Sequence, residues 1–204
     1  MATNTEFRKM MAKNVSFLYP RLDQPYRYNA QEKRTESCAE TVQGAGYSLS
    51  WSMSEEDGKA FFREARDHYN AQREVNRKLP EFKNIFGMKK LDDGTVHFTA
   101  KKRAVSSQGK VNKAPVVVGP DLKDLPEKNI WSGSIGNIRV LAFPTTDPQG
   151  VGGISLLLDA VQVVEAKYGG DGLGDDFEIV DAPPAASVEQ FDANAGKELA
   201  DAEW

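Results

Sequence analysis

The sequence has one cysteine, two histidines and no long apolar stretch. Cys38 cannot form a disulfide within the chain, and a single thiol suits a reducing cytoplasm. Because only His68 and His97 accompany it, a zinc site built from Cys and His would need almost every candidate ligand in the chain. No apolar run approaches the ~20 residues that a membrane helix requires, so we expect no membrane contact.

The sequence also lacks the signatures of nucleotide-dependent enzymes. A phosphate-binding loop of the Walker type needs a glycine five positions before its Gly-Lys pair, and the pairs at 58–59, 109–110 and 196–197 have none there. The glycine cluster at 150–153 lacks the spacing of a dinucleotide-binding fingerprint, so we interpret it as a barrel bend or loop. Asp92 and Asp93 precede a glycine and indicate a turn rather than a metal site. We therefore expect no cofactor, no metal and no catalytic activity.

Charge is distributed unevenly along the chain. The net charge of -4 conceals a body, residues 1–168, with 25 Lys and Arg against 20 Asp and Glu. Residues 169–204 hold one Lys and ten Asp and Glu. A basic body joined to an acidic tail is typical of proteins that contact nucleic acid with one part and other partners with the other.

The acidic tail is predicted to be disordered. It begins with a glycine-rich hinge at 169–174, and glycine loses more backbone entropy on ordering than any other residue. The remainder has too little apolar surface to offset the cost of folding. We therefore divide the chain into a domain at 1–168 and a flexible tail at 169–204. The tail ends in Asp201, Glu203 and Trp204, which are candidates for docking on a partner protein.

One long helix is expected at about 54–79. Ser54 is a favourable N-cap, and three acidic residues follow it in the first turn, where the helix dipole favours negative charge. Pro80 ends the segment. The apolar residues between these ends recur at helical spacing: Phe61, Phe62, Ala65, Tyr69, Val75 and Leu79.

Most of the remaining body is predicted to be strand. Short segments rich in β-branched and aromatic residues alternate with Gly, Pro and Asp turns. Five or six strands with one helix fit a small barrel. The expected strands are 14–19, 47–53, 95–99, 116–118, 137–143 and 154–165.

The densest basic segment follows the strand that carries Phe98. Between positions 101 and 113 there are five cations and no acid: Lys101, Lys102, Arg103, Lys110 and Lys113. Cations neutralise phosphates, and an aromatic ring offers a stacking face worth ~1–3 kcal/mol per base. This combination favours binding to a single-stranded nucleic acid, although a solvated hairpin would carry the same charges.

Other aromatic residues lie among cations. Tyr26 and Tyr28 flank an arginine in the N-terminal part. Arg139 and Phe143 occupy one face of a later strand, because their spacing is even. We include all four among the candidate nucleic-acid contacts.

Several blocks occur in a characteristic order along the chain. They are 93–98 leading into Lys101, 116–118, Asp121, 125–126, 133–134, 137–144, the long block 150–165, the glycine-rich hinge and the acidic tail with its terminal aromatic residue. Together they resemble the replicative single-stranded-DNA-binding proteins of tailed bacteriophages. The resemblance covers residues 90–204 well, and residues 14–80 only in the layout of a strand pair followed by a helix.

The resemblance implies a mainly β protein: a five-stranded OB-fold barrel with one long inserted helix and a disordered acidic tail. Phe98 and Lys101 match an aromatic residue and a cation near the family's DNA groove. Where the family can carry a tyrosine after the proline that matches Pro144, this chain has Thr145, so the stacking role passes to Phe143 or Trp131.

The resemblance also implies partners and a location. Single-stranded DNA would occupy the groove, and the tail would compete with it while contacting the phage DNA polymerase, helicase or primase. The protein would act as a monomer or homodimer in the cytoplasm of the infected bacterial host. Two alternatives stay open: an RNA-binding OB module, and a phage structural or assembly protein.

Overall fold

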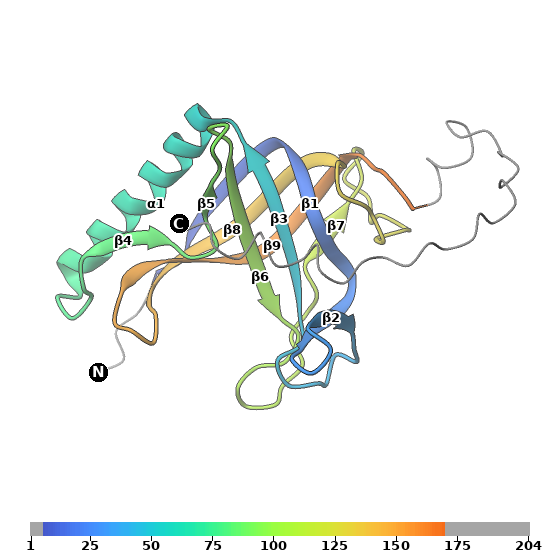
Figure 1. Cartoon of the computed structure of the whole chain (residues 1–204), viewed down its shortest axis with the longest axis horizontal. Coiled ribbons are helices and arrows are strands. Elements are labelled where there is room, and N and C mark those ends of the chain that lie inside the picture. Colours follow the sequence, from blue (N-terminus) through green and yellow to red (C-terminus); the bar gives the residue numbers. More distant parts are fainter. Residues whose placement is uncertain (1–5, 170–204) are drawn as a thin grey trace, which may run out of the picture. The chain divides into compact units, whose positions relative to one another are not determined.

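Five strands of the computed structural model close into a barrel, as predicted (Figure 1). The structure describes residues 6–169. Neighbouring strands around the barrel are antiparallel, except that β6 and β9 are parallel. The order around the barrel is β1 (Arg8–Asn29), β3 (Gly46–Met53), β6 (Val96–Arg103), β9 (Gly152–Glu165) and β8 (Ile135–Thr146), which returns to β1.

The core of the barrel follows from the alternation of side chains along each strand. In β8, every second residue from Gly136 to Pro144 is buried, and the residues between them face outward. The largest side chains that are fully buried include Phe17, Leu49, Trp51, Phe98, Ile138 and Leu158. Because alternate residues fill the interior, the remaining residues of the same strands form the outer face of the barrel.

The helix α1 (Glu55–Val75) packs across one end of the barrel (Figure 1). Ser54 is its N-cap, and its hydroxyl oxygen accepts a hydrogen bond from the backbone N–H of Asp57 at 3.1 Å. The ring of Phe61 lies 4.9 Å from that of Phe98 in the core. Within residues 6–169, no helix has both the length and the apolar character needed to cross a membrane.

The helix ends earlier than predicted. Its C-cap is Asn76, where the backbone leaves the helical conformation, so the predicted last turn to Leu79 is not helical. Val75, counted in the apolar stripe, is 87% exposed. The stripe that packs on the barrel therefore ends at Tyr69, and the chain beyond Asn76 turns back toward Pro80, whose carbonyl accepts a hydrogen bond from the Tyr69 hydroxyl.

Four short strands extend the barrel sheet. β2 (Arg34–Ser37) pairs with the far end of β1, and β5 (Lys89–Lys90) pairs with β6. β4 (Phe82–Ile85) and β7 (Val116–Val118) both run parallel to β9. Only β7 was among the predicted strands. The others are short segments with many exposed polar residues, which carry little hydrophobic pattern of their own.

The predicted acidic tail falls almost wholly outside the described residues. Its expected disorder, and the expected docking role of Asp201, Glu203 and Trp204, concern residues 170–204, on which the described structure does not bear. The boundary proposed after Tyr168 stays a prediction.

Candidate nucleic-acid interface

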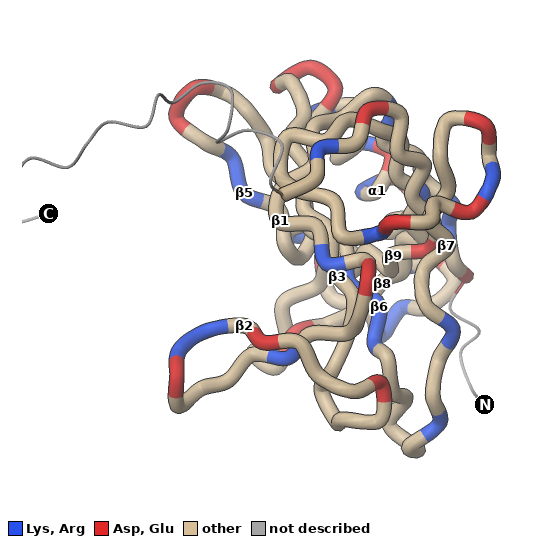
Figure 2. Tube along the Cα trace, turned by 90° about the vertical axis from the view of Figure 1, so that its right-hand side faces the viewer, with Lys and Arg blue, Asp and Glu red and all other residues tan. Residues whose placement is uncertain are grey.

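The basic residues of β6 lie at the end of the strand where it parts from β9. Val96, Phe98 and Ala100 point into the barrel, so Thr99 and Lys101 point outward. Lys101 is paired in register with Leu157 of β9, and beyond it the half-buried Lys102 and the exposed Arg103 end β6. Figure 2 shows Lys and Arg along this end of β6. Within residues 6–169, none of these three cations forms an ion pair, which leaves their charges free for a ligand.

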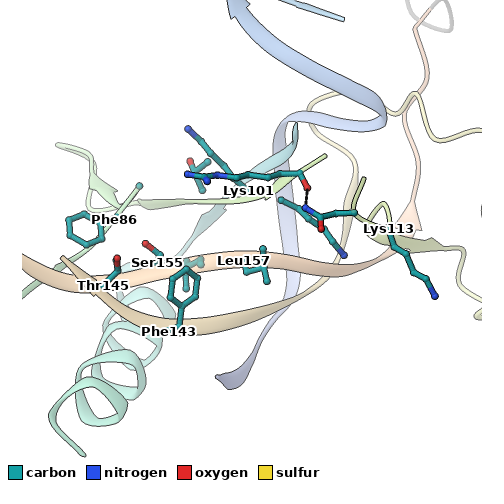
Figure 3. A pocket seen from close by; sticks show the side chains of 13 residues that line it. Phe86, Lys101, Lys113, Phe143, Thr145, Ser155 and Leu157 are labelled. Atoms are coloured by element: carbon teal, nitrogen blue, oxygen red, sulfur yellow. Dashed lines mark hydrogen bonds between the residues drawn. The ribbon is translucent and has the colours of Figure 1, made fainter. Parts of the chain in front are cut away.

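The larger cavity of the region, of about 960 Å³, lies over the outer faces of β6, β9 and β8 (Figure 3). The rings of Phe86 and Phe143 lie toward one end of it, and Lys113 lies at the other (Figure 3). Hydroxyl groups and one amide contribute polar atoms, and Asn112 Nδ2 donates a hydrogen bond to the backbone oxygen of Arg103 at 3.0 Å. The lining is Phe86, Gly87, Thr99, Lys101, Lys102, Arg103, Asn112, Lys113, Phe143, Thr145, Ser155, Leu156 and Leu157.

A second cavity, of about 490 Å³, adjoins the first. Tyr26 and Tyr28 line it from β1, and the guanidinium carbon of Arg21 lies 5.7 Å from the centre of the Tyr26 ring. Lys101, Lys102 and Arg103 line both cavities. We call the two cavities together the basic groove: a phenylalanine-lined part and a tyrosine-lined part that meet at three cations.

Two tyrosines that line the groove, Tyr26 and Tyr47, stay uncharged at physiological pH. Burial, assisted by a hydrogen bond from the Tyr47 hydroxyl to Glu40 at 3.1 Å, raises the pKa of Tyr47 to about 12. Burial is also the main cause that raises the pKa of Tyr26, whose hydroxyl donates to Asp23 at 3.1 Å. Neither phenol therefore adds negative charge that would repel a phosphate.

Most of the predicted contact residues come together in the groove. Lys101, Lys102, Arg103, Lys113, Phe143, Tyr26 and Tyr28 all line it. Tyr28 is 61% exposed, so its ring is available to a base. The predicted common face of Arg139 and Phe143 is confirmed, since both point outward from β8.

The structure corrects the expectation for Phe98. Its side chain is 0% exposed and stacks on Trp51, with ring centres 5.7 Å apart. The prediction that this ring offers a stacking face to bases is wrong, because odd-numbered residues of β6 face outward and Phe98 faces the core. The aromatic surface of the groove comes from neighbouring strands instead.

Three other predicted residues lie outside the groove lining. Trp131 is 57% exposed, but it belongs to the loop before β8. Lys110 sits at the exposed tip of the loop after β6. Arg139 forms an ion pair with Asp159 on the outer face of β9, which offsets its charge. Their role in binding stays a prediction.

Phe86 is the main groove residue that the sequence analysis missed. It follows β4, whose pairing with β9 gave no sequence signal. Its position depends on Gly153: a methyl group there would lie 2.8 Å from the Phe86 ring and 2.5 Å from the Asn84 carbonyl oxygen. The glycine cluster at 150–153, interpreted as a bend or loop, thus includes a close approach between β9 and the segment that carries Phe86. Thr145 is a second missed residue, and its even spacing from Phe143 on β8 could have revealed it.

Comparison with known proteins identifies the fold. No protein-family model matches the sequence, and no curated protein sequence matches it significantly. The single-stranded DNA-binding protein of bacteriophage Enc34, solved in complex with ssDNA, is similar over 78% of this chain and 88% of that one, with a TM-score of 0.54 and 16% identity. The protein gp2.5 of bacteriophage T7, a single-stranded DNA-binding protein, is similar over 88% of this chain and 100% of that one, with a TM-score of 0.52 and 17% identity. The resemblance drawn from the sequence blocks is thereby confirmed at the level of the fold: this chain has the OB-like barrel of the phage single-stranded DNA-binding proteins.

Proposed function

We propose that the protein binds single-stranded DNA in the basic groove, without sequence preference, during phage DNA replication and recombination. The observation that carries this proposal is that three cations, none of them in an ion pair within residues 6–169, line both parts of the basic groove together with partly or fully exposed aromatic rings. OB-folds bind oligonucleotides on the face of their second and third strands and at the adjoining loops. Here those strands are β3 and β6, and β6 supplies the three cations.

The mechanism requires binding alone. Lys101, Lys102 and Arg103 neutralise phosphates, and the release of counterions from the DNA drives association. The rings of Phe143 and Tyr28 stack on bases, which any base accepts because each has a π-face. A single OB barrel of this kind covers ~4–16 nucleotides. Coating the template would remove hairpins and protect the strand, with no catalytic step and no cofactor.

The test is an anisotropy titration of fluorescently labelled oligo-dT at about 50 mM and about 200 mM salt, where such binding is strongly salt-dependent. We expect Lys101→Ala/Arg103→Ala to weaken binding at least about tenfold and to reduce the salt slope by about 0.7 per cation lost. The matched control is Arg77→Ala/Lys78→Ala, which removes two exposed cations beyond the end of α1, outside both cavities. Equal affinities of the two double variants would contradict the proposal.

The same titration separates the alternatives. An RNA-binding OB module would prefer oligo-U over oligo-dT of the same length, because the 2′-hydroxyl distinguishes the two at a site built for RNA. A structural or assembly protein would bind neither. Tight binding of oligo-dT, with a weaker oligo-U complex, is the result we expect.

We further propose that the acidic tail competes with DNA for the groove. A tethered segment with ten acidic residues acts at high effective concentration, so it screens the cations even when it binds weakly. Truncation after Tyr168 should tighten oligo-dT binding, most strongly at low salt, where charge interactions are least screened. Equal affinity of the truncated and full-length proteins at low salt would overturn the competition.

The end of the tail is proposed to dock on the phage replication machinery. Trp204, flanked by Glu203 and Asp201, offers one large apolar side chain in an anionic setting. Trp204→Ala should leave oligo-dT affinity unchanged and weaken capture of the phage DNA polymerase in a pull-down. The helicase or primase is the second candidate for the same assay. The site of action would be the cytoplasm of the infected bacterial cell, and sedimentation would distinguish monomer from homodimer.

A further inference from the structure

The aromatic surface of the groove does not end at Phe143. The ring of Phe7, the residue before β1, lies with its centre 5.4 Å from the centre of the Phe143 ring. Phe7 is 57% exposed, so it covers its neighbour only in part and presents its own ring to solvent. Because Phe143 lines the larger cavity, Phe7 is the next ring beyond that cavity in the direction of β1.

The outer face of β1 continues the same chemistry. Met10 and Ala12 are buried, whereas Lys9 and Met11, which alternate with them, are exposed. Lys9 pairs in register with Leu141 of β8, and Met11 pairs with Arg139. Apolar and cationic side chains therefore alternate across the outer face where β1 and β8 adjoin.

Charge on this face is mainly positive. Residues 6–13 contain Arg8, Lys9 and Lys13 against one acid, Glu6. Arg8 is paired with Glu64 of α1, whereas Lys9 and Lys13 form no ion pair within residues 6–169. On the outer face of the neighbouring strands, Asp159 of β9 is paired with Arg139 of β8. Between residues 6 and 13, the two lysines without an ion pair outnumber the one acid, so an anionic ligand that leaves the cavity over Phe143 meets an excess of positive charge.

We propose that the start of β1 is a second segment of the DNA path, which rests on the proposed function of the groove. A single strand that leaves the larger cavity passes over Phe143, stacks a base on Phe7 and places its next phosphates near Lys9 and Lys13. The alternation of ring and cation suits a polymer that alternates base and phosphate, whereas a protein interface core is depleted in charged residues. The occupant is thus the continuation of the groove's own ligand.

The test uses two lengths of oligo-dT on the full-length protein. A short one of about 6 nucleotides fits within the groove, and a long one of about 20 nucleotides exceeds the ~4–16 nucleotides of one OB fold. Phe7→Ala should weaken the long complex about five- to tenfold and leave the short one unchanged, because only the long strand reaches β1. Lys9→Ala/Lys13→Ala should reduce the salt slope of the long complex alone, by about 0.7 per cation.

Each outcome has one meaning. Phe143→Ala, inside the groove, should weaken the binding of both oligonucleotides. If Phe143→Ala and Lys101→Ala/Arg103→Ala each bind both oligonucleotides normally, the proposed function of the groove itself fails. If Phe7→Ala lowers the affinity for both oligonucleotides equally, or for neither, the β1 path is overturned while the proposed role of the groove stands. A circular dichroism spectrum of Phe7→Ala tests whether the variant keeps the fold. A change in sedimentation without any length-dependent loss would instead make this face an interface between copies of the chain, and would also overturn the proposal.

Discussion

Lys101 of β6 lies opposite Leu157 of β9, and this register pair joins the two parallel strands that close the barrel. The same position begins the row of cations in the groove. Past Lys101, β6 leaves β9, and β7 takes over the pairing with β9 at Ala160. The place where the barrel sheet divides is thus the place where three cations, none of them in an ion pair within residues 6–169, line both cavities.

The ring of Phe143 should contribute directly to DNA affinity. Phe143→Ala removes a stacking face worth ~1–3 kcal/mol per base, so we expect oligo-dT binding to weaken by about 5- to 150-fold. Anisotropy of labelled oligo-dT measures the change. Tyr19→Ala is the matched control, because Tyr19 is 74% exposed and lines neither cavity. A comparable loss in both variants would show that ring exposure, and not the groove, determines affinity.

Phe98 should matter for stability and not for binding. Phe98→Ala removes a fully buried ring from the contacts with Trp51 and Phe61, and substitutions of this kind cost ~3–5 kcal/mol. Urea unfolding followed by circular dichroism measures the loss. The folded fraction should bind oligo-dT with unchanged affinity, and a loss of affinity without loss of stability would restore the original sequence-based assignment of Phe98.

Substitution of Gly153 should lower both the stability of the fold and the affinity of the groove for DNA. Gly153→Ala places a methyl group 2.8 Å from the Phe86 ring and 2.5 Å from the Asn84 carbonyl oxygen, so β4 and Phe86 must shift. Overpacking of this size costs ~1–3 kcal/mol. Thermal unfolding should report the destabilisation, and oligo-dT affinity should fall with the displacement of Phe86. Gly109→Ala, where no atom lies within 4 Å of the added carbon, should show only the strain of its positive φ.

The pH dependence of stability should carry a signature of Glu55. Hydrogen bonds from Lys90 at 2.8 Å and Lys59 at 2.9 Å lower the pKa of this carboxyl group to about 2. Because the folded-state pKa lies below the unfolded value, the contribution is complete above about pH 4.5 and is lost as the pH falls toward 2. Glu55→Gln should therefore lower the melting temperature at pH 7, with a gap that closes over this acidic range.

The control for that experiment is Glu74→Gln on the same helix, since Glu74 forms no ion pair within residues 6–169. Both lysine partners of Glu55 are exposed, so added salt should also shrink the gap. A gap that persists unchanged at pH 2 would contradict the assignment of the effect to these two ion pairs.

Local sequence signals predicted the elements that carry their own pattern. Ser54 and the acids after it placed the start of α1 correctly, because capping is decided within one turn. Val116–Val118 was predicted with its observed bounds. The end of α1 was predicted too late, since Val75 continues the apolar spacing although it packs against nothing in the barrel.

Features set by contacts between distant segments were not predictable in this way. Alternation shows that Phe98 and Lys101 face opposite sides of β6, but which side is the interior depends on the strands that close around it. Phe86 reaches the groove only because β4 runs beside β9. The contribution of Phe7 likewise depends on the pairing of β1 with β8, more than a hundred residues later in the chain.

The pairing of β1 with β8 has a consequence for folding during synthesis. Arg8 is in register with Ala142, so the first strand has no permanent neighbour on that side until most of the chain has left the ribosome. Loop-closure entropy must be overcome before such distant segments meet, which makes barrels of this topology slow to fold. During synthesis, the backbone N–H and C=O groups on that edge of the N-terminal strand therefore have no strand partner. Lysines on an unpaired strand edge disfavour its pairing with other chains.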